Sequence, residues 1–175
     1  MVKLVPLSNT DPDAVEALLD AAFGAERRGR TAYRMREGTC AIGPLSFSAC
    51  GEDVLLGTIQ CWPVRLEDGD RSDPLVLVGP VAVVPDLQRS GIGKRLMTEM
   101  LRVADSGVAD ALMMIGDPEY YGRFFGFEAE STAGWAVPGP VERHRLLARI
   151  RRPGGVGAIG TIVPDPSFAL AAIPA

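Results

Sequence analysis

Residues 88–94, QRSGIGK, combine two glycines with two basic side chains between an apolar run and an amphipathic segment. The β-branched and aliphatic run before them predicts a strand, and the residues from Lys94 onward predict a helix. The first amides of a helix have no intrahelical partner and carry partial positive charge, so this junction could bind an anion, typically a phosphate. Gly91 and Gly93 would allow close approach of the backbone, and Arg89 and Lys94 would add full charges. The alternative is a tight turn with solvated basic residues.

Two well-known phosphate motifs are excluded by their spacing. A Walker P-loop requires glycine five residues before the Gly-Lys pair and Ser or Thr after it, where this chain has Gln88 and Arg95. A dinucleotide-binding fingerprint would require glycine at Leu96 and a purely parallel strand order. The pattern therefore supports neither kinase or GTPase chemistry nor dinucleotide binding.

The elements that must position this loop can be read from periodicity and turn residues. Asp11 followed by Pro12 predicts a helix start, and apolar residues at helical spacing continue to Gly24. Alternating patterns predict a hairpin and then a third strand after a polar turn at 67–74, which makes an antiparallel meander. The expected strands are 3–7, 45–50, 54–66, 75–84, 111–115, 135–137, 145–150 and 158–163, with helices at 12–23, 94–105 and 119–125. The fold class is α/β (α+β), with a mixed central sheet and flanking helices.

Gly79-Pro80 lies inside the third strand of this meander. Proline cannot donate a hydrogen bond to a sheet ladder, so a bulge or a splay is expected there. The basic segment 25–38, AERRGRTAYRMREG, could form an irregular helix or a loop. A solvated surface is the favoured interpretation of this segment, although several of its side chains could line a substrate entrance: Arg27, Arg28, Arg30, Tyr33 and Arg36.

Composition restricts the function further. At 175 residues, with 47% hydrophobic and 23% charged residues, the chain is expected to form one domain spanning 1–175. The net charge of −4 gives no general affinity for nucleic acid or anionic membrane. Apolar runs are too short for a membrane span and the N-terminus has no signal-peptide pattern, so a cytoplasmic location is expected. Three cysteines without zinc spacing and a single histidine predict no metal site.

The segments QRSGIG at 88–93 and GDPEYYGRFFGF at 116–127 resemble the GCN5-related N-acetyltransferase (GNAT) superfamily. The first matches the family's [Gln/Arg]-x-x-Gly-x-[Gly/Ala] loop at every specified position. Together with GPVAVVPD before the loop, they resemble the YhbS-type branch of bacterial acetyltransferases. The resemblance covers about residues 3–150, which leaves 151–175 as a C-terminal extension.

This resemblance implies a GNAT fold with splayed central strands, and acetyl-CoA as co-substrate. It implies a pyrophosphate on the 88–94 loop, a pantetheine arm along the strand, and a main-chain amide near Val83 as oxyanion donor. It also implies a tyrosine that returns a proton to the thiolate, for which Tyr120 and Tyr121 are the candidates. The implied cofactor-binding residues are Val81, Ala82, Val83, Gln88, Arg89, Ser90, Gly91, Ile92, Gly93 and Lys94.

The sequence departs from the family in two places. The family's tyrosine lies four residues before the Gly of Gly-Phe, which is Gly122 here, so Tyr121 is shifted by one and a helix bulge would have to restore its aim. The strand 75–84 lacks the carboxylate that serves many relatives as general base. The remaining candidates are Glu52, Asp53, Asp117, Glu119 and His144, or else a water chain or an amine of low pKa; Cys61 is a weak candidate for an acetyl-enzyme.

The predicted function is direct transfer of acetyl to a primary amine of a small molecule or peptide. The alternative is a catalytically idle CoA-binding or regulatory domain of the same fold. For the acceptor, carboxylates at 52–53 favour a cationic amine, whereas the arginines of 27–36 favour an anionic one. Edge strands near 135–163 offer a surface for a homodimer.

Overall fold

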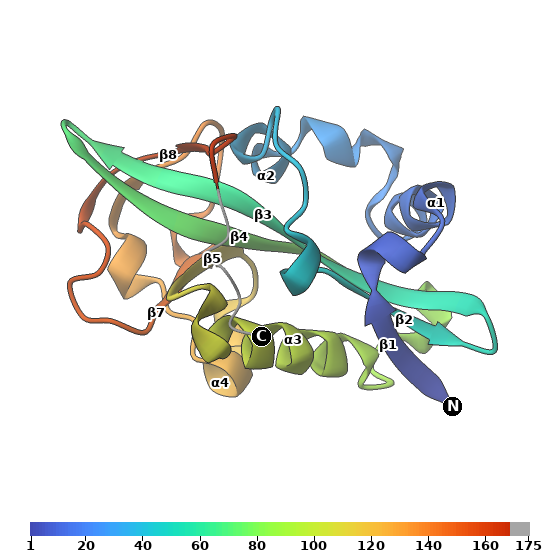
Figure 1. Cartoon of the computed structure of the whole chain (residues 1–175). Coiled ribbons are helices and arrows are strands. Elements are labelled where there is room, and N and C mark those ends of the chain that lie inside the picture. Colours follow the sequence, from blue (N-terminus) through green and yellow to red (C-terminus); the bar gives the residue numbers. More distant parts are fainter. Residues whose placement is uncertain (169–175) are drawn as a thin grey trace.

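A computed structural model describes residues 1–168 and has helices on both faces of one central sheet. Helices α1 (Pro12–Phe23) and α2 (Thr31–Met35) lie on one face, and α3 (Ile92–Val103) and α4 (Pro118–Phe125) lie on the other (Figure 1). The predicted α+β class with a mixed sheet is confirmed. Part of the expected C-terminal extension, 169–175, lies outside the described residues.

The sheet follows the order β1-β2-β3-β4-β5-β7, with β8 pairing both β3 and β6. Only β4 with β5 and β6 with β8 are parallel; all other pairs are antiparallel. The predicted meander and its parallel neighbour are therefore present. The strands are β1 (Val2–Pro6), β2 (Phe47–Gly51), β3 (Val54–Asp68), β4 (Arg71–Val83), β5 (Ala111–Ile115), β6 (Gly134–Ala136), β7 (Leu146–Ile150) and β8 (Ile159–Pro164).

Strands near 135–163 offer less free edge than the sequence suggests. Strand β8 has a neighbour on each side. The outer side of β7 is partly covered because Glu128 and Ala148 exchange two backbone hydrogen bonds of 2.9 and 2.8 Å. A homodimer through this region stays a prediction.

The polar turn expected at 67–74 is much tighter in the structure. Asp68 pairs directly with Arg71, so β3 and β4 continue to a two-residue turn at Gly69 and Asp70. The extension is held because β8 pairs with β3 from Val64 to Glu67. The polar residues at 67–74 indicated a loop. In the structure most of them belong to paired strands that extend beyond the core, and they are polar because their outer faces meet solvent.

Local capping signals set the helix starts as predicted for α1 and α4. The Asp11 carboxylate accepts the Asp13 amide at 3.1 Å, and the Asp117 carboxylate accepts the Glu119 amide at 3.0 Å. Helix α3 begins at Ile92, two residues before the predicted Lys94, because Ile92 is only 5% exposed and packs into the core below the sheet.

The expected bulge at Gly79-Pro80 is present. Ile59 pairs with Val81 and Cys61 with Val78, so Gln60 alone faces the two residues Gly79 and Pro80. Strands β4 and β5 pair only at Val76–Leu112 and Leu77–Met113 and then separate. The sheet therefore opens just where the bulge lies.

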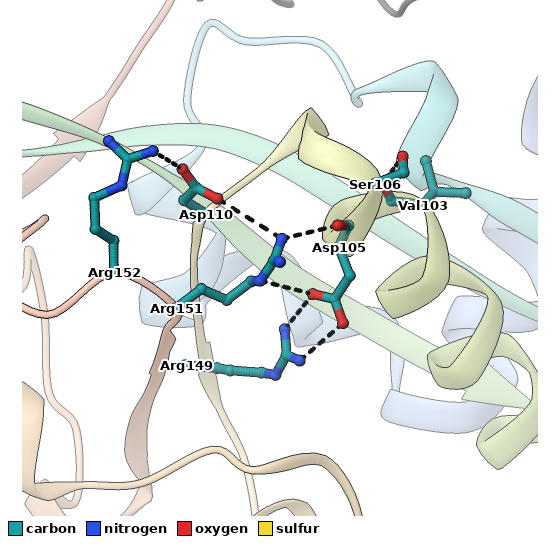
Figure 2. A network of polar contacts seen from close by, with 7 residues as sticks. All are labelled: Val103, Asp105, Ser106, Asp110, Arg149, Arg151 and Arg152. Carbon is teal, nitrogen blue, oxygen red and sulfur yellow. Dashed lines mark hydrogen bonds and ion pairs between the residues drawn. The ribbon is translucent and has the colours of Figure 1, made fainter.

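A polar network ties the residues that follow α3 to the end of β7 and the residues after it (Figure 2). Asp105 accepts two hydrogen bonds from Arg149 of β7, at 2.7 and 2.9 Å, and its carbonyl accepts one from Arg151 at 2.9 Å. Arg152 donates to Asp110 at 2.9 Å. The Arg149 guanidinium lowers the pKa of Asp105. This network fixes the link between α3 and β5, and with it the position of α3 under the sheet.

Candidate active site

A pocket of about 1080 Å³ lies where β4 and β5 separate. The lining comes from β4, the end of β5 and α4, from the 23–36 segment, and from residues 140–145, of which Arg145 accepts the Gly116 amide through its carbonyl at 2.9 Å. The lining residues from β4, β5 and α4 are Leu77, Val78, Gly79, Pro80, Val81, Met114, Ile115, Gly116, Asp117 and Tyr121.

Within residues 1–168, some backbone polar groups of β4 at this opening have no strand partner. The Val84 amide donates to the Leu56 carbonyl at 2.9 Å. Hydrogen-bonded pairs alternate along an antiparallel ladder, so Ala82 bonds toward Thr58 whereas Val81 and Val83 direct their amides and carbonyls away from β3. Those groups face the side on which β5 has diverged. An extended ligand could pair with Val81 and Val83 as an added strand.

The glycine loop lies at the Val83 end of this strand. A Cβ atom on Gly93 would lie 3.7 Å from a Val83 methyl group. Arg89 and Gly91 both have positive φ, 71° and 87°, and Gly91 is the N-cap of α3. The first helical hydrogen bond runs from the Arg95 amide to the Gly91 carbonyl at 3.0 Å.

The amides of Ile92, Gly93 and Lys94 therefore precede the hydrogen-bond ladder of α3 and are free to bind an anion. The Ser90 amide was expected to be available to an anion, but it donates to the Leu87 carbonyl at 3.1 Å. The Lys94 ammonium lies 4.9 Å from the centre of the Phe124 ring, which links the loop to α4.

The two tyrosines of α4 have different surroundings. Tyr121 lines the pocket, and burial, with a smaller effect of Tyr120 and Asp117, raises its pKa to about 12. Tyr120 is 36% exposed and packs against Phe124. The anticipated helix bulge is not found: α4 is α-helical to Phe125 and ends with αL Gly126. Tyr121 lines the pocket without it.

The general-base candidates are mostly outside the pocket. Of those named from sequence, only Asp117 lines it, and its carboxylate is engaged in capping α4. His144 is exposed, with its Nε2 3.5 Å from Glu142 Oε2. Glu142 itself lines the pocket and was missed by sequence reasoning, because only tertiary packing brings residue 142 to the pocket. Cys61 is fully buried and burial raises its pKa, which disfavours a nucleophilic thiolate.

The basic 25–38 segment is folded against the pocket, so the favoured solvated-surface interpretation is wrong for its two buried arginines. Arg27 is 1% exposed and pairs with Asp20 at 2.8 Å and with Glu16. Arg36 is 8% exposed. Arg30 and Tyr33 also line the pocket, and so does Arg145, which sequence reasoning missed; Arg28 does not.

Within residues 1–168, no three His, Cys, Asp or Glu side chains are grouped to hold a metal ion. None of the helices in that range is both long enough and apolar enough to cross a membrane.

Comparison with solved structures identifies the fold. The E. coli GNAT family N-acetyltransferase YhbS in complex with CoA has a TM-score of 0.70, with 21% identity over 97% of this chain and 93% of that one. A GNAT family acetyltransferase from Brucella melitensis in complex with acetyl-CoA has a TM-score of 0.63, with 23% identity over 94% and 96% of the two chains. No curated protein sequence matches.

The acetyltransferase (GNAT) family model matches residues 13–127. This range contains the meander, the glycine loop and α4, which together build the opening between β4 and β5. The chain belongs to the acetyltransferase (GNAT) family.

Proposed function

We propose that this protein transfers the acetyl group of acetyl-CoA directly to an amine acceptor in a ternary complex. The observation that carries the proposal is the opening between β4 and β5. The free groups of Val81 and Val83 border it, the N-terminus of α3 lies at one end, and Tyr121 lies toward the other.

The proposed cofactor position follows from these groups. The pyrophosphate would accept hydrogen bonds from the amides of Gly91 to Lys94, with charge from Arg89 and Lys94 and polar side chains from Gln88 and Ser90. The pantetheine amides would pair with Val81 and Val83. The CoA and acetyl-CoA complexes of the E. coli and Brucella proteins support this choice of cofactor.

The reaction requires a neutral amine to attack the thioester carbonyl carbon. The carbonyl oxygen becomes an oxyanion, for which the amide of Val83 or Val81 is the proposed donor. The carbon–sulfur bond then breaks and leaves a thiolate, while the amine nitrogen loses one proton to water in the pocket.

Tyr121 is the proposed group that stabilises the leaving thiolate. With a pKa of about 12 it stays protonated at neutral pH, so it can donate a hydrogen bond. A free thiol has a pKa of about 8.5, so complete transfer of the phenol proton would be uphill. We therefore assign Tyr121 as a hydrogen-bond donor to the sulfur during bond cleavage, with the thiol completed by the proton released from the amine.

A second candidate function is a CoA-binding domain without transferase activity. Two observations favour it: Leu75 to Val84 carries no carboxylate to act as base, and the only carboxylates on the pocket lining within residues 1–168 are Asp117 and Glu142.

Calorimetric titration with CoA, combined with a thiol-release assay over a panel of amines, separates the two candidates. The proposal expects CoA binding and acceptor-dependent thiol release. CoA binding without release on any amine would favour the idle domain, and failure to bind CoA would contradict both.

A further inference from the structure

Within residues 1–168, Arg36 is a buried cation without a carboxylate partner. It follows α2 directly and lines the pocket, yet only 8% of its surface is exposed. No Asp or Glu within residues 1–168 forms an ion pair with it, whereas the other buried arginine, Arg27, has Glu16 and Asp20. Burying an unpaired charge is costly, so this arrangement calls for an explanation.

Aromatic rings hold the Arg36 guanidinium in a fixed orientation. Its central carbon lies 3.9 Å from the centre of the Tyr33 ring and 4.1 Å from that of Trp62. Cation–π contact with two rings offsets part of the cost of burial but uses none of the N–H donors. The guanidinium donates from Nη1 to Gln60 Oε1 at a long 3.4 Å, and a contact with the Tyr33 hydroxyl also favours its charged form.

The remaining donors of Arg36 are open to the pocket. The fully enclosed polar side-chain atoms without a partner in residues 1–168 are Thr58 Oγ1 and Trp62 Nε1. Nε and Nη2 of Arg36 are not among them, although neither donates a hydrogen bond of standard geometry within those residues. A rigidly held guanidinium edge with free donors matches the geometry of a carboxylate or a phosphate.

We infer that Arg36 binds an anionic group, a carboxylate or a phosphate monoester, carried by the amine acceptor. The inference rests on the proposed function and narrows its substrate class. Arg30 and Arg145 line the same pocket, so with Arg36 three arginines without a described carboxylate partner outnumber the two lining carboxylates, Asp117 and Glu142. The carboxylates at 52–53 are not on the lining. The structure thus favours an anionic over a purely cationic acceptor.

The anion belongs to the acceptor because the CoA pyrophosphate has its own site. The loop at 88–94 is not part of the pocket lining and adjoins Val83, whereas Arg36 lines the pocket and stacks on Trp62 of β3. The amine would then lie between Arg36 and Tyr121, with its anionic end held away from the thioester.

The test uses matched probes on the full-length protein saturated with CoA. N-acetylated amino acids, N-acetyl-phosphoethanolamine and the neutral primary amides of the same N-acetylated amino acids are titrated calorimetrically into wild type, Arg36→Gln and Arg34→Gln. Arg34 lies on α2 but not on the pocket lining, so it controls for loss of charge. We expect wild type and Arg34→Gln to bind an anionic probe about 10- to 100-fold more tightly than its neutral amide, and Arg36→Gln to lose that ratio.

The carboxylate and phosphate probes decide which anion is preferred. Three results would overturn the inference. Wild type could bind charged and neutral probes equally, or bind no anionic probe. Alternatively, Arg36→Gln could keep the wild-type ratio of affinity for an anionic probe over its neutral amide. A large drop in Tm of Arg36→Gln with an unchanged ratio would assign Arg36 a structural role only.

The titrations, combined with the thiol-release assay, separate this inference from the proposed function. Anion binding that depends on Arg36, without thiol release from any amine, would uphold Arg36 as an anion site and reject the transferase. Thiol release with neutral amines alone would uphold the transferase and reject the anion site at Arg36.

Discussion

Gly116 and Tyr121 pack so closely that a Cβ atom on Gly116 would lie 2.7 Å from Cδ2 and Cε2 of the Tyr121 ring. The glycine thus makes room for the ring at the end of β5, where the chain enters α4. This contact explains how Tyr121 reaches the pocket although it is one residue out of step with the family's usual spacing.

Gly116→Ala is expected to displace the Tyr121 ring and to lower kcat about 10-fold or more, because a small misplacement of a group at the reacting centre is costly. CoA affinity should change little, since Gly116 is remote from the 88–94 loop. Steady-state kinetics and CoA titration measure both. Gly43→Ala is the control, because nothing lies within 4 Å of its added methyl; equal kcat for the two variants would contradict the packing argument.

Tyr121→Phe removes the proposed donor to the leaving sulfur while keeping the ring. We expect kcat to fall about 100-fold with CoA affinity preserved. Tyr120→Phe is the matched control, because that side chain is partly exposed and lies outside the pocket lining. A Tyr121→Phe enzyme with the wild-type rate would show that another group stabilises the thiolate.

The raised pKa of Tyr121 predicts a loss of stability at alkaline pH. An unfolded tyrosine ionises near pH 10, whereas folded Tyr121 has a pKa of about 12. Its contribution is complete below pH 10 and is lost as pH rises to 12, because deprotonation favours the unfolded chain. Urea unfolding from pH 9 to 11 should show wild type losing stability faster than Tyr121→Phe. Parallel curves would contradict the burial of the phenol.

Arg89 has a left-handed backbone that suits glycine better than arginine. Arg89→Gly is therefore expected to stabilise the fold by about 1 kcal/mol and to weaken CoA binding several-fold through the lost charge. Gly91→Ala should lower both stability and affinity, because its φ of 87° is strained for alanine although no atom lies within 4 Å of the added Cβ. Chemical unfolding measures the expected changes in stability, and CoA titration measures those in affinity. Arg89→Lys, which keeps the charge, should retain most of the affinity.

Arg27 joins α1 to the wall of the pocket. Arg27→Gln should lower the free energy of unfolding by about 2 kcal/mol or more, because it leaves the Glu16 and Asp20 carboxylates without their buried partner. Arg28→Gln breaks only an exposed contact to Glu16 and should cost about 0.5 kcal/mol or less. Similar losses from both variants would show that burial of Arg27 contributes nothing.

The parts of the fold that sequence predicted depend on local signals. Asp11-Pro12 and Asp117-Pro118 mark helix starts, Gly126 marks a helix end, and Gly79-Pro80 marks the bulge. Each signal acts within a few residues, so it could be interpreted without knowing the fold. The glycine loop was found for the same reason.

The acceptor side of the site could be predicted only in part, because the sequence offers the arginines of 27–36 as entrance residues but favours a solvated surface for them. Arg36 and Glu142 share a pocket although more than a hundred positions separate them, and no local pattern distinguishes a buried arginine from a solvated one. The burial of Arg36 depends on Trp62 of β3, and the tight turn at Gly69 depends on β8. Such features arise from tertiary packing alone.

The two walls of the pocket come from different stretches of the chain. In the proposed reaction, lining residues between 77 and 121 form the acetyl-donor side and the 23–36 segment forms the acceptor side. Selectivity could therefore be re-engineered by exchanging the short 23–36 segment for that of another family member, with the donor half left untouched. A chimera of this kind would inherit its preference for acceptors from the graft and its rate of thioester cleavage from the host.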